Sequence, residues 1–192
     1  ENNLEHTHAH DALSDVDALI GVAKLIREKQ PEMYDYLLKM RDKKAVQQLV
    51  NLDEPKPFIY ASGRYDAQWN KTTVALPIAP AEHGNVYVYD LRHDTSRWNT
   101  MSDEELQAYI AMPYAERGDD YVSFPIKKLQ YNRVPAVAPL GVLSAHDGWE
   151  KIGLTLDTVE ANRRDVYEQK AFIERAVRML GVREASFVKK DQ

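Results

Sequence analysis

Five short segments between residues 58 and 138 constrain the fold of this chain more than any other feature of its sequence. Each is rich in β-branched or aromatic residues and is bounded by turn residues, a pattern typical of β-strands. The segments are residues 58–62, 72–78, 86–91, 122–129 and 134–138. The prolines among them stand at segment ends or edges, where a missing backbone donor is tolerated. Several short strands at this spacing predict a small antiparallel barrel rather than a parallel sheet.

Helical patterns precede the predicted barrel. Apolar residues at helical spacing predict helices over residues 10–30, 31–41 and 44–52. Pro31 suits the first turn of the second helix, because its missing N–H has no helical partner there. Residues 53–57, Asp-Glu-Pro-Lys-Pro, then predict a linker into the barrel.

Further helices are expected within the strand series and after it. Ser102 is followed three residues later by Glu105, which predicts a capping box at the start of an inserted helix. The acidic run at this point is therefore interpreted as capping rather than as a metal site. After Gly153 two more helices are predicted, the first capped by Asp157 and the second ended by Gly181.

The net charge limits how this chain could bind nucleic acid. Its 192 residues include 30 acidic and 25 basic ones, which gives a formal net charge of −5. A protein with a negative net charge repels the phosphate backbone of DNA, so any DNA contact is expected from a local basic patch. Basic residues outnumber acidic ones between residues 24 and 44, but such an excess is usually a solvated helix face.

Two stretches combine aromatic with basic residues near the predicted strands. The first contains Arg64, Trp69 and Lys71, and the second contains Lys127 and Lys128. Single-stranded DNA is held by bases stacked on aromatic rings and by cations that follow the phosphates, so these five residues are DNA-binding candidates. For Trp69, packing over the barrel core is an equally good interpretation.

His10 and Asp15 form a candidate site at the start of the first helix. Residues five apart on a helix differ by about 140°, so His10 can meet Asp15 only from the preceding loop or the first turn. Asp15 begins a row that continues through Leu19, Val22 and Ile26, a predicted buried stripe. Its carboxylate would then be partly desolvated and would need a backbone donor, a base or a metal ion. The residues alone favour a simpler role, in which acidic residues complement the helix dipole.

The motif His-x-Ala-x-x-Asp at residues 10–15, followed by an apolar helix, resembles the last motif of the exonuclease superfamily that uses four acidic residues and a histidine. Further stretches narrow the resemblance to the exodeoxyribonuclease I family and extend it over nearly the whole chain. They are Gln-Pro at 30–31, Tyr-Asp-Tyr-Leu at 34–37, Ala-Ser-Gly-Arg-Tyr at 61–65 and Val-Pro-Ala-Val-Ala-Pro at 134–139.

The resemblance implies an α+β fold: a small antiparallel SH3-like β-barrel with an inserted helix, flanked by N-terminal and C-terminal helices. Residues 1–30 would be the incomplete C-terminal tail of an exonuclease domain. Residues 31–154 would form the SH3-like barrel domain with its leading helices. Residues 155–192 would be a helical segment leading to a C-terminal domain that this chain lacks.

The resemblance also implies the chemistry of the parent enzyme. It would degrade single-stranded DNA from the 3′ end in DNA repair and recombination, by phosphodiester hydrolysis with two metal ions, Mg²⁺ or Mn²⁺. Asp15 would be a metal ligand and His10 the general base that deprotonates the attacking water. The other acidic residues of the family's site are not in this chain, so the fragment alone is expected to be inactive and to hold the metal poorly.

The resemblance implies a protein partner as well, the acidic C-terminal tail of the single-stranded DNA-binding protein. Tyr36 matches a residue of the pocket that receives this tail. A glutamine and an arginine of that pocket are replaced here by Pro139 and Ser144, which weakens the expectation.

Two other interpretations remain open. The chain could be a non-catalytic module that binds single-stranded DNA or a protein, in which His10 and Asp15 only cap a helix. A metal-dependent hydrolase using His6 and His8 is a more distant alternative, because no apolar strand precedes them. The chain has no cysteine and no apolar run long enough for a signal peptide or a membrane span, so a cytoplasmic protein without membrane contact is expected. A monomer is expected as well.

Overall fold

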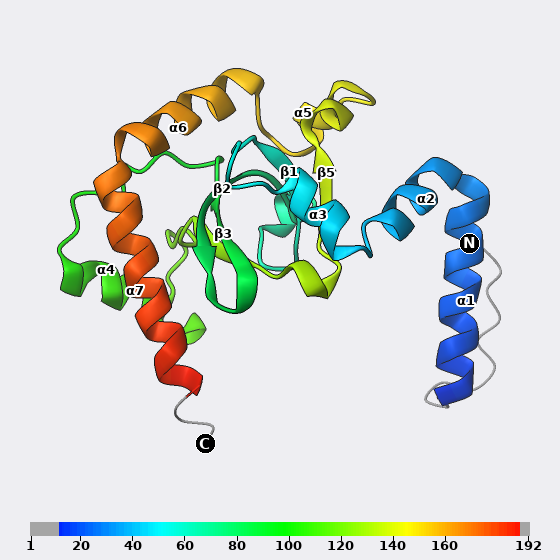
Figure 1. The fold of residues 1–192 in the computed structure, drawn as a ribbon, viewed down its shortest axis with the longest axis horizontal. Coiled ribbons are helices and arrows are strands. Elements are labelled where there is room, and N and C mark those ends of the chain that lie inside the picture. Colours follow the sequence, from blue (N-terminus) through cyan, green and yellow to red (C-terminus); the bar gives the residue numbers. More distant parts are fainter. Residues whose placement is uncertain (1–11, 189–192) are drawn as a thin grey trace.

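The computed structural model describes residues 12–188 and, within that range, the side chains of residues 16–182. Its centre is a five-stranded antiparallel sheet with the strand order β4-β3-β2-β1-β5 (Figure 1). The strands are β1 (Phe58–Ala61), β2 (Thr72–Ala81), β3 (Asn85–Asp90), β4 (Ile126–Leu129) and β5 (Ala136–Pro139). The predicted α+β fold with a small antiparallel strand series is therefore confirmed.

Two strands differ from their predicted limits by three residues or more at one end, and proline accounts for both of these differences. β4 begins only at Ile126, because Pro125 has no N–H to donate and instead accepts a hydrogen bond from the Asp90 N–H with its carbonyl. β2 runs on to Ala81 through a shift in register between Pro77 and Ala79, which lets a proline stand within the strand.

The sheet is buried on both faces because its strands are apolar at successive positions. Tyr87 and Tyr89 of β3 lie in one hydrophobic core, whereas Val86 and Val88 lie in the other. Successive strand residues point to opposite faces, so each strand supplies both cores. Helices cover the two faces: α3 packs Val46 on one side, and α4, α6 and α7 pack on the other.

The described range contains seven α-helices besides the sheet. They are α1 (Ala12–Lys29), α2 (Pro31–Lys39), α3 (Lys43–Leu49), α4 (Asp103–Ala111), α5 (Gly148–Lys151), α6 (Leu156–Glu168) and α7 (Lys170–Val188). Helices α1 and α2 form an arm that extends away from the sheet, and α6 and α7 run along the opposite side (Figure 1). None of the helices described is both long and apolar enough to cross a membrane.

The start of α4 confirms the predicted capping box. The Ser102 hydroxyl accepts a hydrogen bond from the Glu105 N–H at 3.2 Å, and the Glu105 carboxylate accepts one from the Ser102 N–H at 2.8 Å. Two backbone donors that the helix leaves without carbonyl partners are satisfied in this way.

The predicted start of the first C-terminal helix and the predicted end of the second were both wrong. Thr155, not Asp157, caps α6, because its hydroxyl stands one residue before the helix and accepts from the Thr158 N–H at 3.1 Å. Helix α7 does not stop at Gly181 but continues to Val188. A glycine inside a helix costs only about 1 kcal/mol relative to alanine, and good helix formers follow it here.

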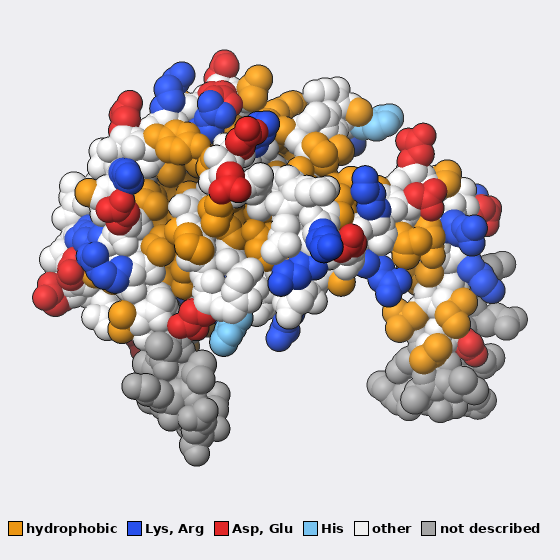
Figure 2. All heavy atoms as spheres, in the orientation of Figure 1, with side chains coloured by type: hydrophobic (Ala, Val, Ile, Leu, Met, Phe, Trp, Pro, Cys, Tyr) orange, Lys and Arg blue, Asp and Glu red, His pale blue; other side chains and the backbone are white. Residues whose placement is uncertain are grey.

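The predicted buried stripe on α1 was also wrong for this chain. Val16, Leu19, Ile20 and Val22 are exposed, Leu19 by 69%. Figure 2 shows apolar side chains on the surface of the α1–α2 arm. The reason is that α1 packs mainly on α2, so most of its circumference meets no other described element.

Arg92, in the loop after β3, ties the sheet to the segment that leads into α6. Its Nη2 donates hydrogen bonds to the carbonyl oxygens of Thr72 at 3.1 Å and Ile152 at 2.7 Å, and its Nη1 donates to that of Gly153 at 3.3 Å. The guanidinium carbon lies 4.9 Å from the centre of the Trp69 ring, a cation–π contact. We call Trp69, Arg92 and Gly153 the latch.

Gly153→Ala should open the latch. The residue has φ +59°, where an L-residue costs roughly 1–2 kcal/mol, and an added Cβ would lie 2.0 Å from Cζ3 of Trp69. We expect the free energy of unfolding, measured by urea denaturation, to fall by about 2 kcal/mol or more. Gly118→Ala is the matched control, because no heavy atom lies within 4 Å of the position that its added methyl group would take. Equal losses in both variants would contradict the latch.

Candidate nucleic-acid interface

A groove of about 730 Å³ runs beside the edge strand β4. We call it the β4 groove. Strand β4, the loop after β1, the loop after α4 and the later part of α7 all contribute to it. The lining residues are Gly63, Arg64, Tyr87, Ile110, Tyr114, Arg117, Tyr121, Ser123, Phe124, Ile126, Lys127, Lys128, Gln130 and Leu180.

The lining of the β4 groove combines cations with aromatic rings. Among the described residues that line it, none is acidic, although the whole chain carries a formal charge of −5. Arg64, Lys127 and Lys128, three of the five residues predicted to bind DNA, lie here together. They come from opposite ends of the barrel sequence, and the sheet brings them into one place.

The cations of the groove lie close enough to repel one another. Burial lowers the pKa of Lys127, the nearby charges of Arg64 and Arg117 lower it further, and Asp90 acts against them. Its ammonium donates to the Ser123 hydroxyl at 2.8 Å and lies 5.2 Å from the centre of the Tyr65 ring. Such a cluster of like charges is an anion-binding feature, because a bound anion relieves the repulsion.

Three of these cations have no carboxylate within ion-pair distance among the described residues. Within the described part of the chain, no ion pair includes Arg64, Arg117 or Lys127. Arg64 donates only a long bond of 3.4 Å to the carbonyl of Lys128, and Arg117 donates to the carbonyl of Met112. Their charges therefore remain available to a ligand.

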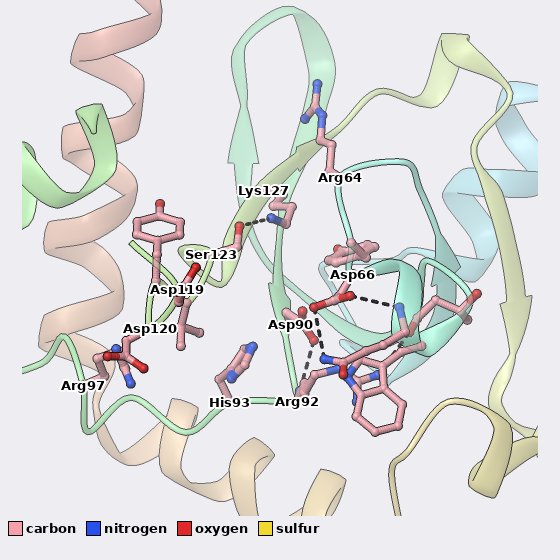
Figure 3. Close-up of a pocket in the computed structure, with 16 residues that line it drawn as sticks. Arg64, Asp66, Asp90, Arg92, His93, Arg97, Asp119, Asp120, Ser123 and Lys127 are labelled. Atoms are coloured by element: carbon pink, nitrogen blue, oxygen red, sulfur yellow. Dashed lines mark hydrogen bonds between the residues drawn. The ribbon is translucent and has the colours of Figure 1, made fainter. Parts of the chain in front are cut away.

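A second hollow, of about 540 Å³, adjoins the groove and shares Arg64, Tyr121, Ser123 and Lys127 with it (Figure 3). We call it the Asp90 pocket. Its lining carries both signs of charge. Besides the shared residues it is lined by Tyr65, Asp66, Gln68, Trp69, Thr72, Asp90, Arg92, His93, Arg97, Asp119, Asp120 and Val122.

Asp90 and Arg92, at the centre of the Asp90 pocket, already have hydrogen-bond partners within the protein. The buried Asp90 carboxylate accepts hydrogen bonds from the Thr73 hydroxyl and, at 3.1 Å, from the Arg92 N–H. Burial lowers the pKa of His93, although Asp90 acts in the opposite direction. This pocket therefore offers less attraction to a phosphate chain than the β4 groove does.

The other two predicted DNA-binding residues lie outside the β4 groove. Trp69 lines the Asp90 pocket, but the guanidinium of Arg92 and the backbone of Gly153 pack against its ring. Lys71 is exposed and lines neither hollow. Tyr114 and Arg117, which follow the end of α4, also line the groove but were not among the residues predicted from the sequence. The signal in the sequence was an aromatic and a basic residue between Pro113 and a glycine, a weak version of the pattern at 64–71.

Tyr36, the predicted partner-binding residue, joins α2 to the barrel. Its hydroxyl donates a hydrogen bond to the carbonyl of Val137 in β5 at 2.9 Å, and burial raises its pKa. Pro139 ends the same strand, and Ser144 is exposed in the short 3₁₀-helix that follows.

The predicted catalytic residues cannot be placed in the same way. His10 lies outside the described residues, and so do His6 and His8. Asp15 lies within α1, but its side chain is not among those described. In the part of the chain that is described, no group of three or more His, Asp or Glu side chains could hold a metal ion.

Comparison with known proteins identifies relatives of one kind. The exodeoxyribonuclease I of Escherichia coli K12 is 30% identical over 155 residues, which are 80% of this chain and 32% of that protein. The exodeoxyribonuclease I of Haemophilus influenzae is 35% identical over 147 residues, which are 74% of this chain and 31% of that protein. The chain thus spans about one third of the length of these relatives.

Solved structures of E. coli exonuclease I have the same fold as this chain over most of its length. E. coli exonuclease I in complex with a dA16 oligonucleotide superposes with a TM-score of 0.81 at 27% identity, over 92% of this chain and 38% of that one. The ExoI/SSB-Ct complex superposes with a TM-score of 0.77 at 26% identity, over 92% of this chain and 37% of that one. Residues 41–180 match the family model described as the exonuclease I SH3-like domain, and the chain therefore belongs to this family.

Proposed function

We propose that this chain is part of a 3′-to-5′ exonuclease of single-stranded DNA, and that its β4 groove holds the strand. The observation that carries this proposal is the lining of the groove, which has four cations and no carboxylate among its described residues in an acidic chain. The E. coli relative has been crystallised with single-stranded oligonucleotides, which supports the same ligand class for this chain.

The physical basis is electrostatic and independent of base sequence. Each phosphate that pairs with a cation releases counterions, so the affinity falls with salt at a slope of about −0.7 per contact for single strands. The four cations of the groove, Arg64, Arg117, Lys127 and Lys128, would together give a slope of about −3. Aromatic side chains in the same groove supply surfaces on which bases can stack.

The chemistry belongs to the parent enzyme in this proposal. Asp15 is a ligand of Mg²⁺ or Mn²⁺ and His10 is the general base, supported by their motif and by the family of the chain. A second candidate describes the fragment itself: a non-catalytic DNA-binding module, favoured by a groove that lies wholly within the barrel region and α7. The exonuclease function and the binding-module function are compatible if DNA binding and hydrolysis reside in different parts of one protein.

The remaining expectations complete the proposal. Tyr36 would contribute to a site for the C-terminal tail of the single-stranded DNA-binding protein, supported by the ExoI/SSB-Ct complex of the relative. The parent would act as a monomer in DNA repair and in the cytoplasm, a reducing compartment that suits the cysteine-free sequence.

Binding of single-stranded DNA tests the groove. In the double variant Arg64→Ala/Lys128→Ala, we expect weaker binding of a fluorescent oligothymidylate and a salt slope flatter by about 1.4, the share of two phosphate contacts. Lys151→Ala, an exposed lysine outside the groove, is the control and should leave both quantities unchanged. Lys71→Ala reports separately whether the strand also crosses the loop before β2. An unaltered salt slope in the double variant would remove the groove from the DNA path.

Lys127→Met separates binding from stability. The lowered pKa means that the folded state disfavours the ammonium relative to the unfolded state, where the pKa is 10.5. This cost is fully present below the folded-state pKa and disappears as the pH rises to 10.5. We therefore expect the variant to be at least as stable as the parent sequence at pH 7, with the difference shrinking at alkaline pH, while DNA binding weakens. Loss of stability together with unchanged binding would give Lys127 a purely structural role.

Nucleotide release from the 3′ end of single-stranded DNA tests the catalytic assignment. The fragment alone should release none with Mg²⁺, because a lone carboxylate holds this ion poorly and recruits no second metal. In the intact enzyme, Asp15→Asn should abolish turnover, and His10→Ala should slow it about 10² to 10⁴-fold. His8→Ala is the control for the neighbouring histidine. Robust Mg²⁺-dependent release of nucleotides by the fragment would contradict the catalytic roles assigned to His10 and Asp15.

A further inference from the structure

Tyr114 is the most exposed large apolar or aromatic side chain in the described part of the chain, at 86%. It lines the β4 groove, beside the cations. A single exposed aromatic residue is common on protein surfaces and needs no explanation by itself. What sets Tyr114 apart is its position over a groove whose described lining has no acidic residue, and the way its backbone is held.

The backbone beneath Tyr114 is fixed. Pro113 presets the chain direction, and a 3₁₀-helix follows at Tyr114–Glu116. The Glu116 N–H donates to the Pro113 carbonyl at 3.0 Å, and the Arg117 N–H donates to the Tyr114 carbonyl at 3.2 Å. The Arg117 side chain donates twice to the carbonyl of Met112, at 3.3 and 3.1 Å. The Tyr114 ring is therefore exposed to solvent on a turn whose backbone is held by hydrogen bonds.

The other rings of the groove are already covered. Tyr121 stacks on Tyr109 with ring centres 5.2 Å apart, and the guanidinium of Arg117 lies 4.6 Å from its ring centre. Phe124 and Tyr87 are 7% and 3% exposed. Among the described rings of the groove, Tyr114 is therefore the one on which a flat apolar ligand can stack fully.

We propose that Tyr114 is the residue of this groove that stacks on a nucleobase of single-stranded nucleic acid, while the neighbouring cations bind the flanking phosphates. The proposal rests on the proposed function and names its stacking residue. Every base presents a π-face, so such a stack tolerates any base sequence. It also selects against duplex, in which both faces of each base are already occupied.

An abasic strand provides the direct test, because it keeps the phosphates and removes the stacking partner. Binding of oligothymidylate and of an abasic oligonucleotide of equal length is measured by fluorescence anisotropy with the full chain. Tyr114→Ala should weaken oligothymidylate binding roughly five- to 150-fold, the range for one base stack, and leave abasic binding and the salt slope unchanged. Tyr114→Trp should retain binding. Tyr167→Ala, a half-exposed tyrosine on α6 outside the groove, is the matched control.

The outcomes separate this proposal from the one on which it rests. Equal losses for both oligonucleotides would overturn the stacking role, since the ring would then act without a base. Unchanged binding in Tyr114→Ala, alongside a flatter salt slope in Arg64→Ala/Lys128→Ala, would overturn stacking and keep the groove. If neither variant differed from the parent sequence, both proposals would fall together. Retained binding by Tyr114→Trp with loss in Tyr114→Ala supports the stack.

Discussion

Burial of both faces of the central sheet is the constraint on which the rest of this structure depends. Strands β1, β2 and β3 place an apolar side chain at nearly every position, so their polar positions are few. Helices must cover each face, because either one left open would expose a large apolar surface. Charged side chains are consequently displaced to the sheet edges and to the loops between strands, and the β4 groove forms there.

Strand β4 shows how this displacement creates a cationic surface. Ile126 and Leu129 are buried at its ends, and the two lysines between them are only partly buried. Lysine on an edge strand also discourages pairing with the edge of another sheet. The same two residues that protect the edge therefore supply positive charge to the groove, together with Arg64 and Arg117 from neighbouring loops.

Local signals made the fold largely predictable, and non-local packing set the limit. The strands and the Ser102 capping box depend on residues within a few positions of one another, and the sequence predicted them. The cap of α6 was misplaced because Thr155 and Asp157 are both good capping residues and only geometry chooses between them. The burial of α1 was misjudged because a periodic pattern reports an apolar face but not what covers it. Arg64, Lys127 and Lys128 could be proposed as candidates from the sequence, but their assembly with Tyr114 into one groove requires the folded sheet.

The latch has a consequence for how force and motion pass through the molecule. Arg92 binds the carbonyl of Ile152, 60 positions along the chain, so the segment between them is closed into a ring by a non-covalent link. That ring contains α4, the turn that presents Tyr114, and strands β4 and β5. Tension on a strand of DNA held in the groove would therefore be borne by the closed ring as a whole and passed to α6 and α7. The barrel and the C-terminal helices should respond to such a load as one mechanical body.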